Sequence, residues 1–316
     1  MYKISLTILL LILTTFFSFA QREKNGDYTA TGFDEIVNTF TSLAANVNAA
    51  NNAISVVDNN MSGASFLGPL EAGDLLLIYQ IQGGDINVNN YPTIANWGNY
   101  VVQNSWFDPG IKYGVNNFIE FGEITNYKNT GTFEFVEVLS VSGTQGITLT
   151  CPLTKDFFTG SNNKTVVVRI PRFNNLDIPS NTSITTSSWD GTTGGVIAIE
   201  VNGTLNITGT GEISADSTGF RGGQPVNQGN AASGAGSISN NNDRGFLGSN
   251  IPSEGSEKGE GIAGGSIEYD VLSTRYGYGS ISNGGGGGGY HNAGGGGGSN
   301  VGVGDYYGYG IVDQGA

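Results

Sequence analysis

A strict alternation of apolar and polar residues over residues 195–215 constrains the fold of this chain more than any other feature. The odd positions are apolar: Ile197, Ile199, Val201, Leu205, Ile207, Ile213 and Ala215. The even positions are polar: Glu200, Asn202, Thr204, Asn206, Thr208 and Glu212. Because successive side chains of a strand point to opposite faces, the pattern predicts three short strands that share one apolar face.

Two architectures fit this alternation. The turn Asn202-Gly203 is a favoured two-residue hairpin turn, which suits a meander of hairpins. Short strands that turn corners and stack on the next coil would instead form a β-solenoid. The alternation is the same in both architectures, so the sequence leaves a solenoid and a sandwich-like element open.

Short strands separated by turn residues also characterise residues 21–175, and we expect strands at 74–81, 133–141, 147–153 and 165–170. In the third of these, Cys151 continues the every-second-residue pattern of apolar neighbours, which predicts a small buried side chain. The segment in which a helix is compatible with the pattern is 33–50, where apolar residues recur three and four apart.

Glycine divides the chain, because most of its 52 glycines lie from Gly191 onward. This composition is typical of a flexible tether. However, tyrosines are interleaved with the glycines, and a glycine run can also form an extended three-residue-per-turn helix that packs closely against its neighbours. Both an ordered polyglycine II bundle and a flexible tether therefore stay open for residues 219–316.

These patterns together predict an all-β chain with four parts. Residues 1–20 form a signal peptide and residues 21–175 an N-terminal β-domain. Residues 176–218 form a short-strand β element, either a solenoid or sandwich-like, and residues 219–316 form the glycine-rich module. Since the chain ends at Ala316 inside the glycine-rich region, we expect that this module is truncated.

The signal peptide follows from a basic Lys3, an apolar run from Ile4 to Phe19, and small residues at Ser18 and Ala20. Cleavage near Ala20 predicts a secreted protein or one on the outer cell surface. No later stretch of the sequence is apolar enough to cross a bilayer, so we expect no membrane span in the mature chain.

The charge of the chain excludes some partners. A formal net charge of -14 argues against nucleic acid and anionic membranes. Only 13% of the residues are charged, and polar character comes mainly from Asn, Thr and Ser, which is typical of extracellular β-proteins. The single cysteine cannot form an intrachain disulfide.

Few residues of this chain are suited to catalysis, because it has one histidine and one cysteine. Glu200 and Glu212, flanked by Asp190 and Asp216, would suit a glycosidase if adjacent coils brought two carboxyl groups about 5 to 9.5 Å apart. One copy of a glycine- and aspartate-rich turn, residues 302–305, lacks the ligands that calcium requires. We therefore expect no enzyme, no cofactor and no metal site.

Binding through aromatic rings is the remaining hypothesis for function. Tyrosine offers an apolar ring and a hydroxyl, which suits sugar rings and protein surfaces. The candidate binding residues are Tyr276, Tyr278, Tyr290, His291, Tyr306, Tyr307 and Tyr309. The partner we expect is an extracellular glycan or a protein surface. Alternatively, the tyrosines line the sides of packed glycine helices and bind nothing.

Several motifs resemble a known group of proteins. They are Val168-Arg169-Ile170-Pro171-Arg172-Phe173, Trp189-Asp190-Gly191, Gly194-Gly195-Val196-Ile197-Ala198-Ile199, Gly219-Phe220-Arg221-Gly222-Gly223, Gly259-Glu260-Gly261-Ile262-Ala263-Gly264-Gly265 and His291-Asn292-Ala293-Gly294. As an ordered set they resemble large glycine-rich secreted proteins of Bacteroidota and myxobacteria. The resemblance implies export, often by the type IX system, with adhesion-type surface roles and no assigned catalytic residues. The C-terminal sorting domain expected for that route is missing from the pattern.

Three functions follow as hypotheses. The leading one is an adhesin-like surface protein that interacts with glycan or matrix without catalysis. A β-solenoid carbohydrate-active enzyme is the second, and it requires clustered acids on one face. A purely structural stalk is the third, and it requires no exposed aromatic surface.

Overall fold

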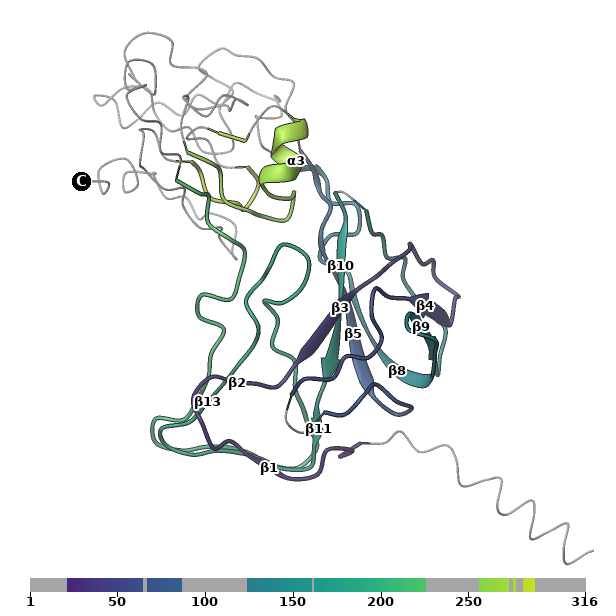
Figure 1. Ribbon diagram of the computed structural model, residues 1–316, viewed down its shortest axis with the longest axis vertical. Coiled ribbons are helices and arrows are strands. Elements are labelled where there is room, and N and C mark those ends of the chain that lie inside the picture. The colour runs from purple at the N-terminus through teal and green to yellow at the C-terminus, as the bar shows by residue number, and fades with distance from the viewer. Residues whose placement is uncertain are drawn as a thin grey trace, which may run out of the picture.

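The computed structural model describes residues 22–64, 67–86, 124–160, 162–225, 256–272, 275–276 and 281–287 (Figure 1). Among these residues, one short helix, α3 (Ser266–Val271), accompanies many β-strands. The predicted all-β fold is confirmed. Most strands form a curled antiparallel sheet and a short parallel stack, and β6 (Asp85–Ile86) pairs separately with β7 (Ile124–Asn126). The described part of the glycine-rich region lies at the opposite end from the stack (Figure 1).

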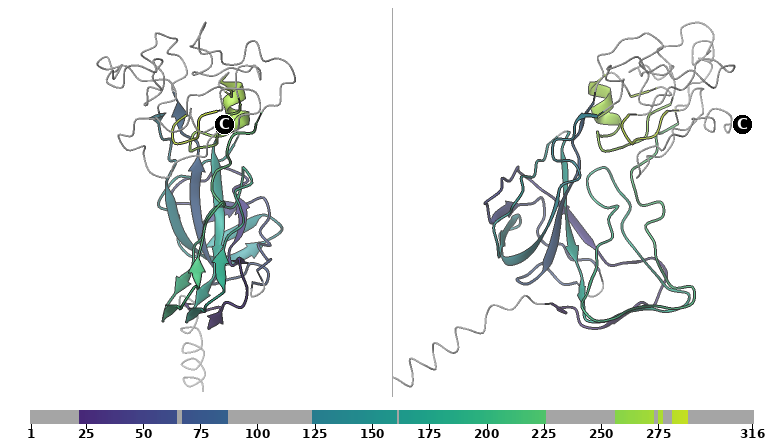
Figure 2. Two further views of the ribbon diagram at one scale, coloured as in Figure 1. Left: turned by 90° about the vertical axis from the view of Figure 1, so that its left-hand side faces the viewer. Right: turned by 180° about the vertical axis from the view of Figure 1, so that it is seen from behind.

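The curled sheet has six antiparallel strands. In spatial order they are β3 (Thr39–Ser42), β10 (Lys164–Ile170), β5 (Leu75–Gln82), β8 (Phe133–Ser142), β9 (Gly146–Leu149) and β4 (Ala53–Ser55). Just beyond the two edge strands, the Val57 amide donates to the Ser42 carbonyl at 2.9 Å and the Ala44 amide to the Ser55 carbonyl at 2.8 Å. These bonds join the two edges, so the sheet curls around its own core (Figure 2). We call this part the barrel.

The barrel buries both faces of its central strands. Leu76, Ile78 and Val167 point into the enclosed core with Phe157 and Leu149. The alternate residues of the same strands form a second apolar layer on the outer face, which residues of the segment 189–220 cover in part. Burial on both faces explains why these strands read as continuous apolar runs in the sequence.

Three of the four strands predicted in this region are confirmed as β5, β8 and β10. The strand predicted at residues 147–153 is β9, which ends earlier, at Leu149, where the chain bends. Cys151 follows the bend and is exposed, so the prediction of a buried cysteine is wrong. The alternation continued past the end of the strand, but Leu153 is buried through a separate pairing of its amide with the Asn51 carbonyl.

The helix considered for residues 33–50 is also wrong. This segment contains β2 (Glu35–Ile36) and β3, and β3 pairs with β10 with Phe40 opposite Val168. Its apolar residues serve different cores, because Val37 is buried in the parallel stack and Leu43 in the barrel. Pairing with β10 outweighs the weak helical spacing.

The parallel stack has three rungs. The first consists of β1 (Tyr28–Thr29) and β2, the second of β11 (Arg172–Phe173), β12 (Leu176–Ile178) and β13 (Ser183–Thr185), and the third of β14 (Glu200–Val201), β15 (Leu205–Ile207) and β16 (Glu212–Ile213). Every pairing between rungs is parallel, and the strand orders are β1-β12-β15, β11-β14 and β16-β13-β2. Of the two architectures left open for residues 195–215, the structure therefore has the solenoid (Figure 2).

Polar side chains stack between rungs at equivalent positions. The Asn206 amide donates to the Asp177 carboxylate at 2.9 Å, and the Thr204 amide nitrogen donates to the Asn175 side chain at 2.9 Å. Both pairs are 29 residues apart in the sequence, which is the length of one turn of the solenoid. Inside the rungs, Leu176, Ile178 and Ile184 form the solenoid core together with Phe173.

The barrel is inserted into the solenoid. The first rung precedes β3, and the second rung begins directly after β10. The Asn174 amide donates to the Asp27 carboxylate at 2.7 Å, although the two residues are 147 positions apart. The division predicted at residue 175 consequently runs through the second rung, and residues 22–38 belong with the solenoid.

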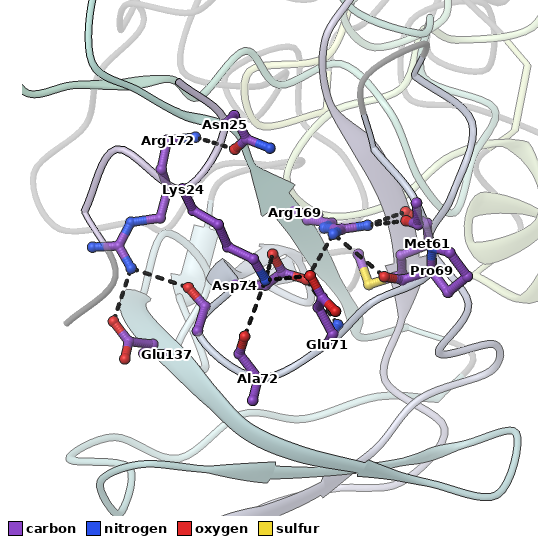
Figure 3. Close-up of polar contacts among 12 residues, drawn as sticks. Lys24, Asn25, Met61, Pro69, Glu71, Ala72, Asp74, Glu137, Arg169 and Arg172 are labelled. Atoms are coloured by element: carbon purple, nitrogen blue, oxygen red, sulfur yellow. Dashed lines mark hydrogen bonds and ion pairs between the residues drawn. The ribbon is translucent and has the colours of Figure 1, made fainter. Parts of the chain in front are cut away.

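A cluster of charges joins the barrel to the solenoid. Asp74 accepts from Arg169 at 2.7 Å and from Lys24 at 2.8 Å, which approach it from two sides (Figure 3). Arg172 donates to Glu137 on β8 at 2.8 Å and pairs with Glu200 on β14. We call these six residues the junction cluster. Burial alone would lower the pKa of Arg172, but its two carboxylate partners outweigh it and raise the pKa.

The described part of the glycine-rich region packs backbone against backbone. A Cβ atom added to Gly284 would lie 2.6 Å from the Gly259 carbonyl oxygen, and one on Gly261 would lie 2.6 Å from the Gly284 nitrogen. The Gln82 side chain donates to the Gly261 carbonyl at 2.8 Å, which connects this region to the barrel. These residues need glycine for close approach. A polyglycine II lattice stays a prediction for residues 219–316.

Candidate functional site

Of the seven predicted binding residues, Tyr276 lies within the described part of the chain. Its side chain is 7% exposed, it forms an antiparallel bridge with Glu257, and the Arg275 guanidinium lies 5.2 Å from its ring centroid. Tyr276 is therefore packed inside the glycine-rich region and offers no exposed ring. Tyr278, Tyr290, His291, Tyr306, Tyr307 and Tyr309 lie outside the described residues, and their role stays a prediction.

The four acids considered for catalysis have separate surroundings. Glu200 pairs with Arg172 in the junction cluster, whereas Glu212 is exposed on β16. Asp190 accepts from the amides of Thr192 and Thr193. Burial would raise the pKa of Asp190, but these hydrogen bonds outweigh it and lower the pKa. Asp216 is exposed in a turn. Local contacts account for Glu200 and Asp190, and Glu212 and Asp216 are exposed.

The described part of the chain also contains no candidate for a metal site or a membrane-spanning helix. No cluster of three or more His, Cys, Asp or Glu side chains occurs there that is suited to a metal ion. No helix within the described ranges combines the length and the apolar character needed to cross a bilayer. The single-copy turn at residues 302–305 lies outside those ranges.

An exposed aromatic surface lies on the outer face of β8. Val136 and Val138 point from this strand into the barrel core, so Phe133 and Phe135 point away from it. Their side chains are 49% and 56% exposed. With Tyr79 of the neighbouring strand and Lys155, these residues form what we call the aromatic face.

Strand register explains why the aromatic face exists. Phe133 lies opposite Tyr79 and Phe135 opposite Leu77 on β5, and Leu77 in turn lies opposite Val168 on β10. The outer apolar layer thus runs across three strands. Trp189 covers it at β10, and it stays uncovered at β8. The aromatic face is the uncovered margin of a buried layer.

The geometry of the face is well defined. The rings of Phe133 and Phe135 meet edge to face, with centroids 5.9 Å apart and planes at 78°. The Lys155 ammonium donates to the Phe133 carbonyl at 2.7 Å and lies 5.1 Å from the Phe133 ring centroid. Burial raises the pKa of Tyr79, so its hydroxyl stays protonated at neutral pH. The face therefore combines apolar rings with an ammonium group.

The aromatic face ends at a β-bulge toward the C-terminal end of β8. The pairing of β8 with β9 shifts register between Val138 and Ser140, which leaves Leu139 54% exposed and returns Val141 to the core side. Flat apolar rings with polar neighbours can stack on the apolar face of a sugar ring or hold a side chain of a protein.

The sequence contains a signal for this face that sequence reasoning missed. In residues 133–138 the phenylalanines and the valines occupy opposite strand faces, so one apolar set must lie outside the core. Valines in a core are common, whereas an adjacent pair of aromatic residues outside the core is unusual. Which face remains uncovered depends on the fold of residues 189–220, so the alternation alone does not reveal it.

Comparisons with known proteins give little guidance. No family model matches the chain, and no curated protein matches it. Among solved structures, the tailspike gp54 of Acinetobacter baumannii bacteriophage AP22, in complex with capsular saccharide, has a TM-score of 0.23 at 19% identity, covering 50% of this chain and 19% of that one.

Two tailspikes of Pseudomonas phages are similar at the same low level. The phi297 tailspike gp61 has a TM-score of 0.23 at 11% identity, covering 60% of this chain and 25% of that one. The LKA1 tailspike gp49 has a TM-score of 0.21 at 13% identity, covering 52% and 27%. The matches span about a quarter or less of each tailspike.

Proposed function

We propose that this chain is a non-enzymatic, adhesin-like surface protein that binds an extracellular glycan through the aromatic face. The observation that carries the proposal is the half-exposure of Phe133 and Phe135 on a strand whose other face buries Val136 and Val138. Exposed aromatic rings cost free energy in water, and two adjacent ones on a rigid strand are ready to cover the apolar side of a sugar.

The surroundings of the face favour a sugar. The Lys155 ammonium lies beside the Phe133 ring and can bond to sugar hydroxyls. The rings are held by the strand and by each other, so little side-chain entropy is lost on binding.

The surface location is part of the proposal. It rests on the apolar N-terminal run and on the low content of charged residues. Export by the type IX system, which the resemblance implies, is proposed on the same footing. Microscopy with an antibody against the folded chain on intact cells tests it, and a signal seen only after permeabilisation would contradict it.

Binding of the mature chain, residues 21–316, to an array of bacterial and host polysaccharides tests the glycan proposal. We expect a bound subset of glycans, and at least a tenfold loss of affinity in the double variant Phe133→Ala, Phe135→Ala. The matched control is Ile267→Ala, Val271→Ala on α3, which removes two apolar side chains that are 75% and 81% exposed. Equal affinities of the two double variants would contradict the proposed site.

The rival functions give different results in the same experiment. A carbohydrate-active enzyme would shorten a bound polysaccharide and release new ends, and Glu212→Gln would abolish this. A structural stalk would bind no glycan on the array. We expect bound glycans of unchanged length, which size-exclusion chromatography of the recovered polysaccharide measures.

A further inference from the structure

The third rung of the solenoid ends the stack of described strands. β14, β15 and β16 each stand at the end of their sheet, and each pairs with one neighbour, in the second rung. The opposite edge of each strand has backbone groups directed away from the stack. Strand edges of this kind accept an added strand.

The side chains of the third rung repeat those of the second. Leu205, Ile207 and Ile213 stand in register with Leu176, Ile178 and Ile184, so each position has the same residue in both rungs. The second-rung residues are 0% exposed because the third rung covers them, whereas the third-rung residues are 47%, 45% and 38% exposed. The third rung thus offers the same apolar surface that already holds a rung.

The other end of the solenoid is closed by a polar group. The Glu35 carboxylate accepts from the Tyr28 hydroxyl at 2.6 Å, from the Thr31 amide at 2.7 Å and from the Gly32 amide at 2.5 Å. A polar terminal repeat is how solenoids end. The first rung also has an exposed apolar residue, Ile36 at 45%, but its backbone amides at Thr31 and Gly32 are bound by this carboxylate, which distinguishes it from the third rung.

Charge indicates what the open edge accepts. Residues 200–218 contain Glu200, Glu212 and Asp216 and no lysine or arginine. Between the second and third rungs, Arg172 stands in register with Glu200 and forms an ion pair with it. Self-association through two third rungs would bring the acidic residues of one copy against the same acids of the other, so like charges oppose it. A basic occupant is complementary.

We propose that the third rung binds an extended segment of a partner protein as a fourth parallel rung. The segment has leucine or isoleucine at alternate positions, opposite Leu205 and Ile207, and a lysine or arginine opposite Glu212. This surface is formed by the solenoid and is separate from the aromatic face, so the proposal does not depend on glycan binding.

A peptide tests the proposal directly. The probe is a fluorescent peptide with the sequence of residues 172–185, which has the apolar spacing of a rung, with Ser183→Lys to place a base in register with Glu212. We expect saturable binding to the mature chain, measured by fluorescence anisotropy, and weaker binding as the salt concentration rises. A control peptide carries Leu176→Lys and Ile178→Lys and should not bind.

Protein variants locate the binding edge. Ile207→Lys should weaken peptide binding at least tenfold, and Ile36→Lys, at a residue that is 45% exposed on the first rung, should leave it unchanged. Both positions are exposed, so both variants should fold, which circular dichroism checks. Absence of binding, or equal loss in both variants, would overturn the proposal. A concentration-dependent dimer that Ile207→Lys abolishes would overturn it in favour of a second copy.

Discussion

Asp74 holds the junction cluster together, because it accepts from two cations that come from different parts of the chain. Its side chain is 5% exposed, and that of Arg169 is 3% exposed. Removing one partner of a buried pair leaves the other charge uncompensated, so Asp74→Ala should lower the free energy of unfolding by about 3–5 kcal/mol. Urea denaturation measures this.

The matched control for Asp74 is Glu71, which also pairs with Lys24 but has a side chain that is 70% exposed. Exposed pairs contribute about 0–1 kcal/mol, so Glu71→Ala should change stability little. Similar losses in the two variants would show that the burial of Asp74 is not what makes it important.

Glu35 makes the closure of the first rung dependent on pH. Its burial raises the pKa, but hydrogen bonds from Tyr28, Thr31 and Gly32 outweigh this and place the pKa below its ordinary value of 4.5. The stabilising contribution is therefore present above about pH 4.5 and is lost as the pH falls through the folded-state pKa.

Glu35→Gln removes this titration while keeping the shape of the side chain. We expect the variant to be less stable than the wild type at pH 7, and the difference to shrink as the pH falls toward 3. Thermal unfolding at a series of pH values measures it. A difference that stays constant with pH would assign the loss to shape and not to charge.

At the scale of elements, the repeated rungs allow the stabilising effect of a covering rung to be measured. Ile184 in β13 and Ile213 in β16 are equivalent in register, but Ile184 is fully buried and Ile213 is 38% exposed. Ile184→Ala should cost about 2–5 kcal/mol of unfolding free energy, and Ile213→Ala clearly less. Equal costs in urea denaturation would mean that the third rung is covered in solution.

Strand positions could be predicted from the sequence where apolar runs or alternation were long. β5, β8 and β10 followed from their own residues. The choice of a solenoid over a meander could not be predicted, because the same alternation serves parallel and antiparallel neighbours. That choice depends on parallel pairing of the third rung with residues 172–185, and the alternation does not specify the partner strand or its direction.

The candidate site was harder to predict than the fold. Tyr276 looked like an exposed ring within a polar segment, yet it is buried and pairs with Glu257. Phe133 and Phe135 lie in a predicted strand, and the sequence does not indicate that their face of β8 is left uncovered. Exposure depends on which distant segment covers which strand, and that information is not local in the sequence.

At the scale of the whole molecule, the junction cluster predicts that barrel and solenoid unfold together. Lys24 lies at the start of the first rung, Asp74 in the barrel and Glu200 in the third rung. We expect a single cooperative transition, with the amides of β5 and β12 equally protected in hydrogen exchange under native conditions. Substantially faster exchange in β12 would show that the solenoid opens by itself.

The insertion of the barrel between two rungs has a consequence for the order of assembly. As the chain emerges N-terminus first, β1 has no neighbour until β12, about 150 residues later, is available. Closing so long a loop is slow when left to diffusion. The barrel shortens the search, because pairing of β3 with β10 sets Thr39 opposite Arg169, and the Asn38 side chain then bonds to the Arg169 carbonyl at 3.0 Å. The barrel thus brings the first and second rungs close to each other. Changes in barrel loops that leave β3 and β10 adjacent should therefore not affect the assembly of the solenoid.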